Sequence, residues 1–185
     1  MSEPQESASF HQPAFSRKNR LMRLAWGVVE VVLFRLSPRP MHRWRCMLLK
    51  LFGAKLGTNV AIYPRTRVWA PWNLACGSNI GIADEAIIYN PSPITLGDYV
   101  TVSQQAYLCG ASHDVMDPDF PLIHAPITLH NHAWICARAT VQMGVTVGEG
   151  AVLALGGVAT KNLQPWTIYA GIPAKAVKKR ELTKP

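Results

Sequence analysis

The sequence predicts an all-β solenoid in which short strands are wound into about five coils behind a helical N-terminal extension. The first observation is an aliphatic side chain at every sixth position of two segments, 96–108 and 129–153. These positions are Leu96, Val102, Leu108, Leu129, Ile135, Val141, Val147 and Leu153. A period of six fits neither a helix nor an alternating strand, but it fits three short strands per coil, each turning one side chain inward.

A longer repeat is the second observation. Similar five-residue segments begin at Leu56, Cys76 and Leu96, 20 residues apart, and at Leu129 and Val147, 18 residues apart. The two extra residues of the longer spacing fall in proline-rich places, 71–72 and 91–93, where a corner can bulge outward. A β-sandwich would instead predict alternation with a period of two and irregular spacing.

The charge distribution argues against nucleic-acid binding. The net charge of +8 is carried by the ends: residues 1–55 contribute +7 and the tail from Lys175 contributes +4, whereas residues 56–174 contribute −3. A nucleic-acid binder would need a basic face on the folded body. The four cysteines form no CxxC pair, which favours small buried side chains and a reducing, cytoplasmic compartment.

The N-terminal part divides into a tail and two helices. Residues 1–16 are polar and are expected to be disordered. Residues 17–36 predict a helix whose apolar run, 24–34, is too short to span a bilayer, and a second helix is expected between Pro40 and Gly53. Two interpretations of residues 17–52 remain open: they cap the first coil, or they lie as a peripheral contact on an anionic membrane surface.

The body and the C-terminal tail follow. The coils occupy residues 56–174, and the six-residue spacing is interrupted once, by a protruding loop at 113–126. A loop of this length without a repeat of its own is usually functional. The basic tail, 175–185, is expected to form a short helix from Ala176 to Leu182.

Several motifs together resemble the hexapeptide-repeat acyltransferases. They are the six-residue spacing, Ser112-His113-Asp114, Gly144-Val145-Thr146-Val147-Gly148 and Gly171-Ile172-Pro173-Ala174-Lys175. Pro71-Trp72-Asn73-Leu74, Tyr89-Asn90 and the basic extension narrow the resemblance to colanic-acid-type exopolysaccharide O-acetyltransferases, which are related to maltose, galactoside and nodulation acetyltransferases. The resemblance implies a left-handed parallel β-helix, a homotrimer, acetyl-CoA as donor and a saccharide as acceptor.

His113 stands at the position of the family's catalytic histidine. A sugar hydroxyl is a poor nucleophile until a base takes its proton, and imidazole titrates near neutral pH. Asp114, Asp117 or Asp119 could orient the ring, and the sequence does not choose among them. The resemblance places Asn90 at the acceptor, where we also expect Asp114, although Asn90 could simply be a turn residue before Pro91.

The resemblance also implies a set of donor-binding residues. They are Trp134, Ala137, Leu155, Thr160, Lys161, Lys175 and Lys178. The first three would line a slot for pantetheine, and the lysines suit the phosphates of coenzyme A. Three positions depart from the family pattern: His130 and Cys136 replace glycines, and Leu155 replaces an alanine of the donor slot, where leucine would either narrow the slot or tilt outward.

No metal is expected. His130 and His132 would point the same way on a strand, but the sequence offers no third ligand beside them. The enzymatic interpretation is acetyl transfer to a hydroxyl in cell-surface polysaccharide biosynthesis, with an acceptor that the apolar N-terminal helices suggest is lipid-linked. The alternative is an inactive solenoid that acts as a scaffold anchored through these helices.

Overall fold

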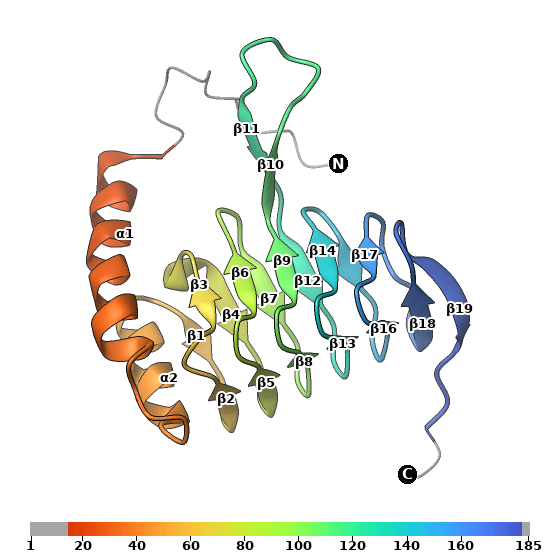
Figure 1. Ribbon diagram of the computed structural model, residues 1–185, viewed down its shortest axis with the longest axis horizontal. Helices are drawn as coiled ribbons and strands as arrows, with labels where there is room; N and C mark the ends of the chain where they lie inside the picture. Colours follow the sequence, from red (N-terminus) through yellow and green to blue (C-terminus); the bar gives the residue numbers. More distant parts are fainter. Residues whose placement is uncertain (1–14, 183–185) are drawn as a thin grey trace.

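The computed structural model describes residues 15–182, and within them it confirms the parallel β-helix (Figure 1). Most of the tail expected to be disordered, residues 1–14, lies outside the described residues. Three parallel sheets, here called A, B and C, run along the solenoid, and the chain visits them in that order in each coil. There are about six coils rather than five, because sheet B contains six parallel strands.

The strands are short throughout. Sheet A contains β1 (Lys55–Leu56), β4 (Leu74–Cys76), β7 (Ile94–Leu96), β12 (Ile127–Leu129) and β15 (Thr146–Val147). Sheet B contains β2 (Val60–Ile62), β5 (Ile80–Ile82), β8 (Thr101–Val102), β13 (Trp134–Ile135), β16 (Val152–Leu153) and β18 (Thr167–Ala170), with β19 (Lys175–Lys179) at its end. Sheet C contains β3 (Arg67–Val68), β6 (Ile87–Tyr89), β9 (Tyr107–Cys109), β14 (Thr140–Gln142) and β17 (Val158–Ala159).

The core is a stack of equivalent side chains from successive coils. In sheet A, Leu96 pairs in register with Leu129, which pairs with Val147. All eight aliphatic residues of the six-residue spacing are at most 1% exposed. This confirms the inward stack, which removes one aliphatic side chain per strand from water. The 3₁₀ turn Pro71–Asn73 forms one of the expected bulged corners.

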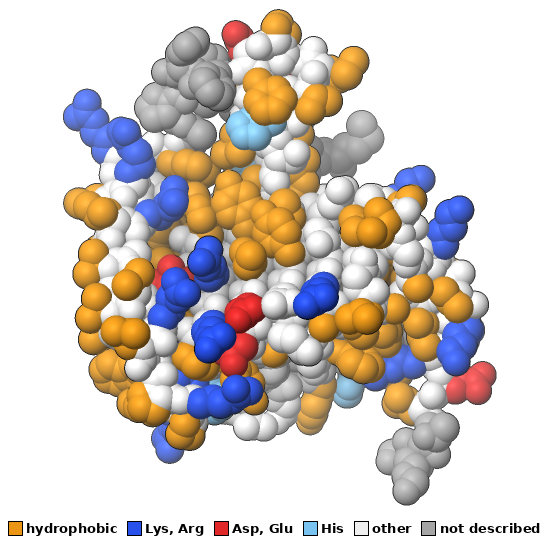
Figure 2. Space-filling view, in the orientation of Figure 1, with side chains coloured by type: hydrophobic (Ala, Val, Ile, Leu, Met, Phe, Trp, Pro, Cys, Tyr) orange, Lys and Arg blue, Asp and Glu red, His pale blue; other side chains and the backbone are white. Residues whose placement is uncertain are grey.

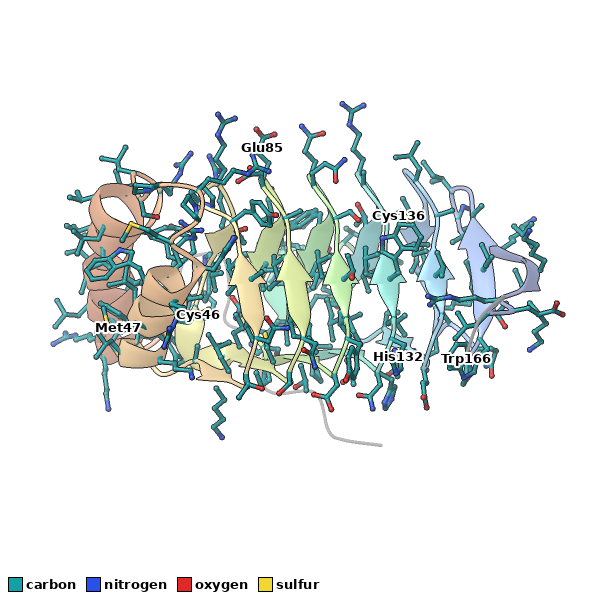
Figure 3. All side chains as sticks on the ribbon, turned by 90° about the horizontal axis from the view of Figure 1, so that it is seen from below. Cys46, Met47, Glu85, His132, Cys136 and Trp166 are labelled. Carbon is teal, nitrogen blue, oxygen red and sulfur yellow. The ribbon has the colours of Figure 1, made fainter. Side chains whose placement is uncertain are left out.

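Corners between the sheets are built from residues in the left-handed conformation. At the corner between sheets B and C, the Gln105 amide donates to Glu85 (2.7 Å) and accepts from Arg138 (2.7 Å). At the corner between A and B, the rings of Tyr99 and His132 stack at 4.8 Å, and Trp166 lies 6.3 Å from His132. Figure 3 shows Glu85 on one edge of the solenoid and His132 beside Trp166 on the opposite edge.

The helix α1 (Arg17–Val29) continues as a π-helical turn, η1 (Glu30–Phe34), and covers the open edge of sheet C. The indole of Trp26 donates to the Val68 carbonyl at 2.6 Å, and the Glu30 carboxylate accepts from the Val68 N–H at 3.2 Å. Both backbone groups of Val68 belong to the outermost strand of that sheet. The first coil is therefore capped, because side chains of the helix satisfy groups that another strand would otherwise pair with.

The second helix, α2 (His42–Leu51), covers the open edge of sheet B in the same way. The His42 ring and the Arg45 guanidinium both contact the Ile62 carbonyl, at 2.9 and 2.6 Å, and the Cys46 thiol donates to the Val60 carbonyl at 3.3 Å. Capping, one of the two interpretations of residues 17–52, is thus confirmed.

Two polar side chains of α1 and η1, Arg23 and Glu30, face the protein rather than the solvent. Arg23 stacks on the Trp69 ring with its guanidinium carbon 3.8 Å from the ring centroid, and Glu30 is occupied by Val68. The outward face is apolar, and its exposed side chains include Leu21, Leu24, Val28, Val31, Val32 and Leu36. Figure 2 shows hydrophobic side chains along the α1 edge, with basic residues at one end of it.

The expectation of a C-terminal helix is wrong. Residues Lys175–Lys179 form β19, which pairs antiparallel with β18 and closes the far end of sheet B. A helix of seven residues gains little in isolation, whereas an open sheet edge offers a row of unpaired backbone groups. Arg180 continues the closure by donating to the carbonyls of His132 and Gly150, each at 2.9 Å.

Arg45 provides a test of the cap. Its side chain is fully buried, and besides Ile62 it donates to the carbonyls of Pro38 (2.9 Å) and Arg39 (2.6 Å). Replacing it by methionine removes the side-chain donor of the Arg39 carbonyl and the charge-assisted hydrogen bonds to Pro38 and Ile62, so Arg45→Met should lower the free energy of unfolding by about 3 kcal/mol. Urea denaturation followed by circular dichroism measures this change. The control is Arg43→Met, an exposed arginine of the same helix; equal effects of the two substitutions would contradict the prediction.

Candidate functional site

The protruding loop is a β-hairpin that leaves the solenoid at the corner between sheets C and A. Its strands are β10 (Ala111–His113) and β11 (Leu122–His124), paired antiparallel with Ala111 opposite His124 and His113 opposite Leu122. Figure 1 shows the hairpin standing out from the coils. The expected excursion at 113–126 is therefore confirmed, and it carries His113 beyond the surface of the sheets.

A backbone carbonyl within the loop orients His113. The Nδ1 atom lies 2.7 Å from the Phe120 carbonyl oxygen, and the two rings stack with centroids 4.6 Å apart and an interplanar angle of 7°. A carbonyl oxygen can only accept a hydrogen bond, so Nδ1 carries the proton of the neutral ring. Nε2 then holds the lone pair, which is the arrangement that a general base requires.

Phe120 contacts His113 through both its carbonyl and its ring, and the sequence analysis did not single it out. It adopts a left-handed backbone conformation with φ 48°, and its N–H donates to the Asp117 carbonyl at 2.9 Å. This turn directs both its carbonyl and its ring toward His113. The only sequence signal was its position between Asp119 and Pro121 in a turn-rich segment.

The loop aspartates do not orient the histidine. The Asp114 carboxylate accepts from the Met116 N–H at 2.9 Å, and the Asp117 carboxylate accepts from the Asp119 N–H at 2.9 Å. These are local turns that shape the hairpin tip. Asp114 is half-buried next to His113, but its carboxylate already has a backbone partner.

His124 anchors the base of the hairpin to the neighbouring corner. Its Nδ1 lies 2.6 Å from the hydroxyl oxygen of Ser92, which is buried. Ala111, opposite His124 in the hairpin, is also buried. The base is thus held against the solenoid while His113, two residues further along, is presented outside it.

Asn90 has a structural position that corrects the expected acceptor contact. Its side chain is 0% exposed, and its amide donates to the Ala70 carbonyl (2.7 Å) and accepts from the Ala70 N–H (2.9 Å). Both polar ends are therefore occupied by the backbone of the preceding coil. The turn interpretation of Asn90 agrees with this geometry, and contact with an acceptor does not.

Three of the expected donor residues lie together around sheet B. Trp134, on β13, is 43% exposed and its indole donates to the Ser103 hydroxyl at 2.9 Å. Ala137 and Leu155 occupy equivalent places in successive coils at the corner between sheets B and C, and Leu155 is 72% exposed. Leucine therefore points into solvent at this corner.

The other donor residues lie elsewhere. Thr160 and Lys161 follow β17 at the corner between sheets C and A, two coils beyond the hairpin. Lys175 and Lys178 are exposed on β19, at the far end of the solenoid. Within one chain, sheet C separates the corner that carries His113 from the corner that carries Ala137 and Leu155.

The two histidines that raised the question of a metal do not share a strand. His130 and His132 belong to the corner turn between sheets A and B, and His132 stacks on Tyr99. Among residues 15–182, no three His, Cys, Asp or Glu side chains are grouped so that they could hold a metal ion. In the same part of the chain, no helix is long and apolar enough to cross a bilayer.

Comparisons with known proteins agree with the geometry. The putative colanic acid biosynthesis acetyltransferase WcaF of Escherichia coli is 33% identical over 177 residues, which cover 95% of this chain and 97% of the relative. A search of protein-family models finds no match.

Two solved structures share the fold. A hexapeptide-repeat acetyltransferase of Vibrio cholerae in complex with acetyl coenzyme A has a TM-score of 0.84 at 22% identity, covering 93% of this chain and 94% of that one. Galactoside acetyltransferase in complex with coenzyme A also has a TM-score of 0.84, at 23% identity, with coverages of 92% and 86%. With WcaF matched along nearly its whole length, the chain belongs to the hexapeptide-repeat acetyltransferases, in the branch of the colanic acid biosynthesis enzyme.

Proposed function

We propose that the protein transfers an acetyl group from acetyl-CoA to a saccharide hydroxyl in cell-surface polysaccharide biosynthesis. In this direct mechanism, Nε2 of His113 takes the proton of the hydroxyl while the oxygen attacks the thioester carbonyl. A backbone N–H stabilises the oxyanion of the tetrahedral intermediate. The intermediate expels the thiolate of coenzyme A, which receives the proton from the imidazolium, so that the base is regenerated.

The observation that carries this proposal is the hydrogen bond between Nδ1 of His113 and the Phe120 carbonyl. It selects the tautomer with a free Nε2 and holds the ring on an exposed hairpin, where substrates can reach it. A carbonyl also stabilises the imidazolium that forms during the reaction, because it continues to accept the Nδ1 proton. No carboxylate is needed for this role.

The donor slot we propose runs past Trp134, Ala137 and Leu155 toward the basic C-terminal end. The small Ala137 lets backbone groups approach the pantetheine chain, and Lys161, Lys175 and Lys178 supply cations for the phosphates. Support comes from the two related structures described above, which contain acetyl coenzyme A and coenzyme A.

The active site is completed between copies of the chain in a homotrimer. His113 and the pair Ala137 and Leu155 occupy different corners of one solenoid, with sheet C between them. Closed cyclic assemblies bring different faces of neighbouring subunits together. The hairpin of one subunit then lies across the donor slot of the next, which gives each trimer three equivalent sites.

The outward face of residues 17–52 lies on the inner face of the membrane as a peripheral contact. Its apolar side chains face away from the solenoid, and exposed basic residues flank them: Arg17, Lys18, Arg20, Arg35, Arg43 and Lys50. An apolar strip with flanking cations suits an anionic bilayer surface. The saccharide acceptor would be lipid-linked and would be met at that surface.

A scaffold without catalysis, anchored by the same helices, is the second candidate. It predicts no affinity for coenzyme A and no role for His113. The tautomer fixed by Phe120 favours the enzyme, because a scaffold gains nothing from it.

The donor half of the proposal can be tested without the acceptor. Acetyl-CoA at about 100 times its dissociation constant should add roughly 2.7 kcal/mol to the free energy of unfolding. Thermal unfolding measures this shift, which should shrink in Lys161→Ala and persist in His113→Ala. With a panel of glycosides, His113→Ala should lower the rate of thiol release by about 10²–10⁴. Absence of any shift in the wild-type protein would leave only the scaffold.

Shared sites can be tested by mixing two inactive subunits. His113→Ala removes the base, and Leu155→Trp fills the slot at an exposed position where folding is unaffected. Co-expression should restore up to about a quarter of the wild-type rate, because a wild-type hairpin meets a wild-type slot in that fraction of random interfaces. Light scattering measures the mass of the co-expressed protein and so checks that trimers have formed. Mixed trimers that stay inactive would contradict a site between subunits.

Vesicle co-sedimentation tests the membrane contact. The double variant Leu24→Glu and Val28→Glu should weaken binding to vesicles of phosphatidylcholine and phosphatidylglycerol by about tenfold or more, since it places charges on the apolar strip. The matched control, Val115→Glu with Met116→Glu, alters two exposed apolar residues of the hairpin and should bind as the wild type does. Equal binding of all three proteins would refute the contact.

A further inference from the structure

A hollow on the outer face of sheet C is lined by three arginines. Arg35 reaches it from the end of η1, Arg65 from the corner between sheets B and C, and Arg67 from β3. Its volume is about 620 Å³, and Ile87 and Gln105 complete the lining together with Glu85. Figure 2 looks onto this face and shows basic side chains gathered beside acidic ones.

The carboxylates near the hollow already have partners. Glu85 accepts from Arg65 at 3.1 Å and from the Gln105 amide at 2.7 Å, and these hydrogen bonds, with that of Gln105 the larger influence, lower its pKa. Glu30 accepts from the backbone of Val68. The guanidinium groups of Arg35 and Arg67 form no ion pair or side-chain hydrogen bond with any residue in the range 15–182, so their N–H donors remain available.

An aromatic surface leads from this hollow to the catalytic hairpin. Across sheet C, Arg67 pairs with Ile87, which pairs with Tyr107. Next to this row, the rings of Trp69 and Tyr89 meet edge to face at 5.7 Å. The Tyr89 carbonyl accepts from the N–H of Gly110 at 2.7 Å, immediately before the hairpin begins. In Figure 2 a hydrophobic patch lies between the basic cluster and the projecting loop.

We infer that the Arg35–Arg65–Arg67 hollow binds the phosphate or diphosphate group of a saccharide carried as a phosphate ester. Guanidinium groups match phosphate oxygens with paired, charge-assisted hydrogen bonds, and two of the three are unoccupied here. A sugar attached to that group would lie on the aromatic surface, where the C–H faces of its ring pack on Tyr89 and Tyr107 on the way to His113. This inference rests on the proposed acetyl transfer and names the class of its acceptor.

The position of Arg35 favours a lipid carrier over a nucleoside carrier. Arg35 directly follows η1, whose Val31 and Val32 are exposed on the outward apolar face, and Leu36 comes next. A diphosphate bound by Arg35 would therefore lie at the edge of the apolar strip. A hydrocarbon chain attached to it could enter the bilayer while its sugar faces sheet C.

Isothermal titration calorimetry tests the site with coenzyme A present at saturation, so that the donor's own phosphate sites are filled. Inorganic pyrophosphate should bind the wild-type protein, and Arg35→Gln with Arg67→Gln should weaken binding at least about tenfold. The double variant Arg35→Lys with Arg67→Lys keeps both positive charges but loses the planar guanidinium groups that bind phosphate through paired hydrogen bonds. It should therefore weaken binding to an intermediate extent. The matched control, Arg43→Gln with Lys50→Gln, removes two exposed cations of α2 and should bind as the wild type does.

Two further probes distinguish the carriers. Farnesyl diphosphate should bind more tightly than pyrophosphate with the same dependence on Arg35 and Arg67, while farnesol, which lacks the diphosphate, should not show that dependence. Tighter binding of uridine diphosphate glucose than of farnesyl diphosphate would overturn the lipid assignment. Absence of pyrophosphate binding, or binding unchanged in the double glutamine variant, would overturn the site itself. Neither result alters the stabilisation by acetyl-CoA or the need for His113, which test the acetyl transfer separately.

Discussion

Backbone groups at the open edge of a β-sheet must find hydrogen-bond partners, and the first coil of this solenoid has such an edge in sheets B and C. Trp26, Glu30 and Arg45 provide the partners from the N-terminal helices. Because Trp26 and Glu30 face the coils for this purpose, the apolar side chains on the opposite side of the helix, such as Leu24 and Val28, are left outside. The cap and the exposed apolar face thus have one cause, and the two interpretations of residues 17–52 are compatible.

Much of the fold could be predicted because each strand turns one side chain inward at a constant interval. The six-residue spacing alone predicts that Leu96, Leu129 and Val147 stack on one another, and the strand register confirms it. The C-terminal strand could not be predicted this way. Lys175–Lys179 has no six-residue repeat of its own. It becomes a strand because it pairs antiparallel with the preceding strand β18, whose open edge exists only once the solenoid is built.

The location of the candidate site depends on a motif, whereas its geometry depends on the conformation of a loop. The position of His113 follows from the resemblance. Its orienting group, however, is the backbone carbonyl of Phe120, seven residues away, and a backbone contact of this kind cannot be predicted from the residue type. Asn90 shows the opposite error. Its residue type suggested a ligand contact, whereas its burial against Ala70 makes it part of the corner. The residues expected to bind the donor follow from motifs, but their dispersal over separate corners is seen only in the structure.

The antiparallel return of β19 has a further consequence. It covers the last edge of the parallel strands of sheet B, as α2 covers the first, so within residues 15–182 both ends of these parallel strands are occupied. Repetitive β-structures with unprotected ends can add copies lengthwise and grow into fibres. A further copy could therefore continue the parallel strands of sheet B only by displacing α2 or β19.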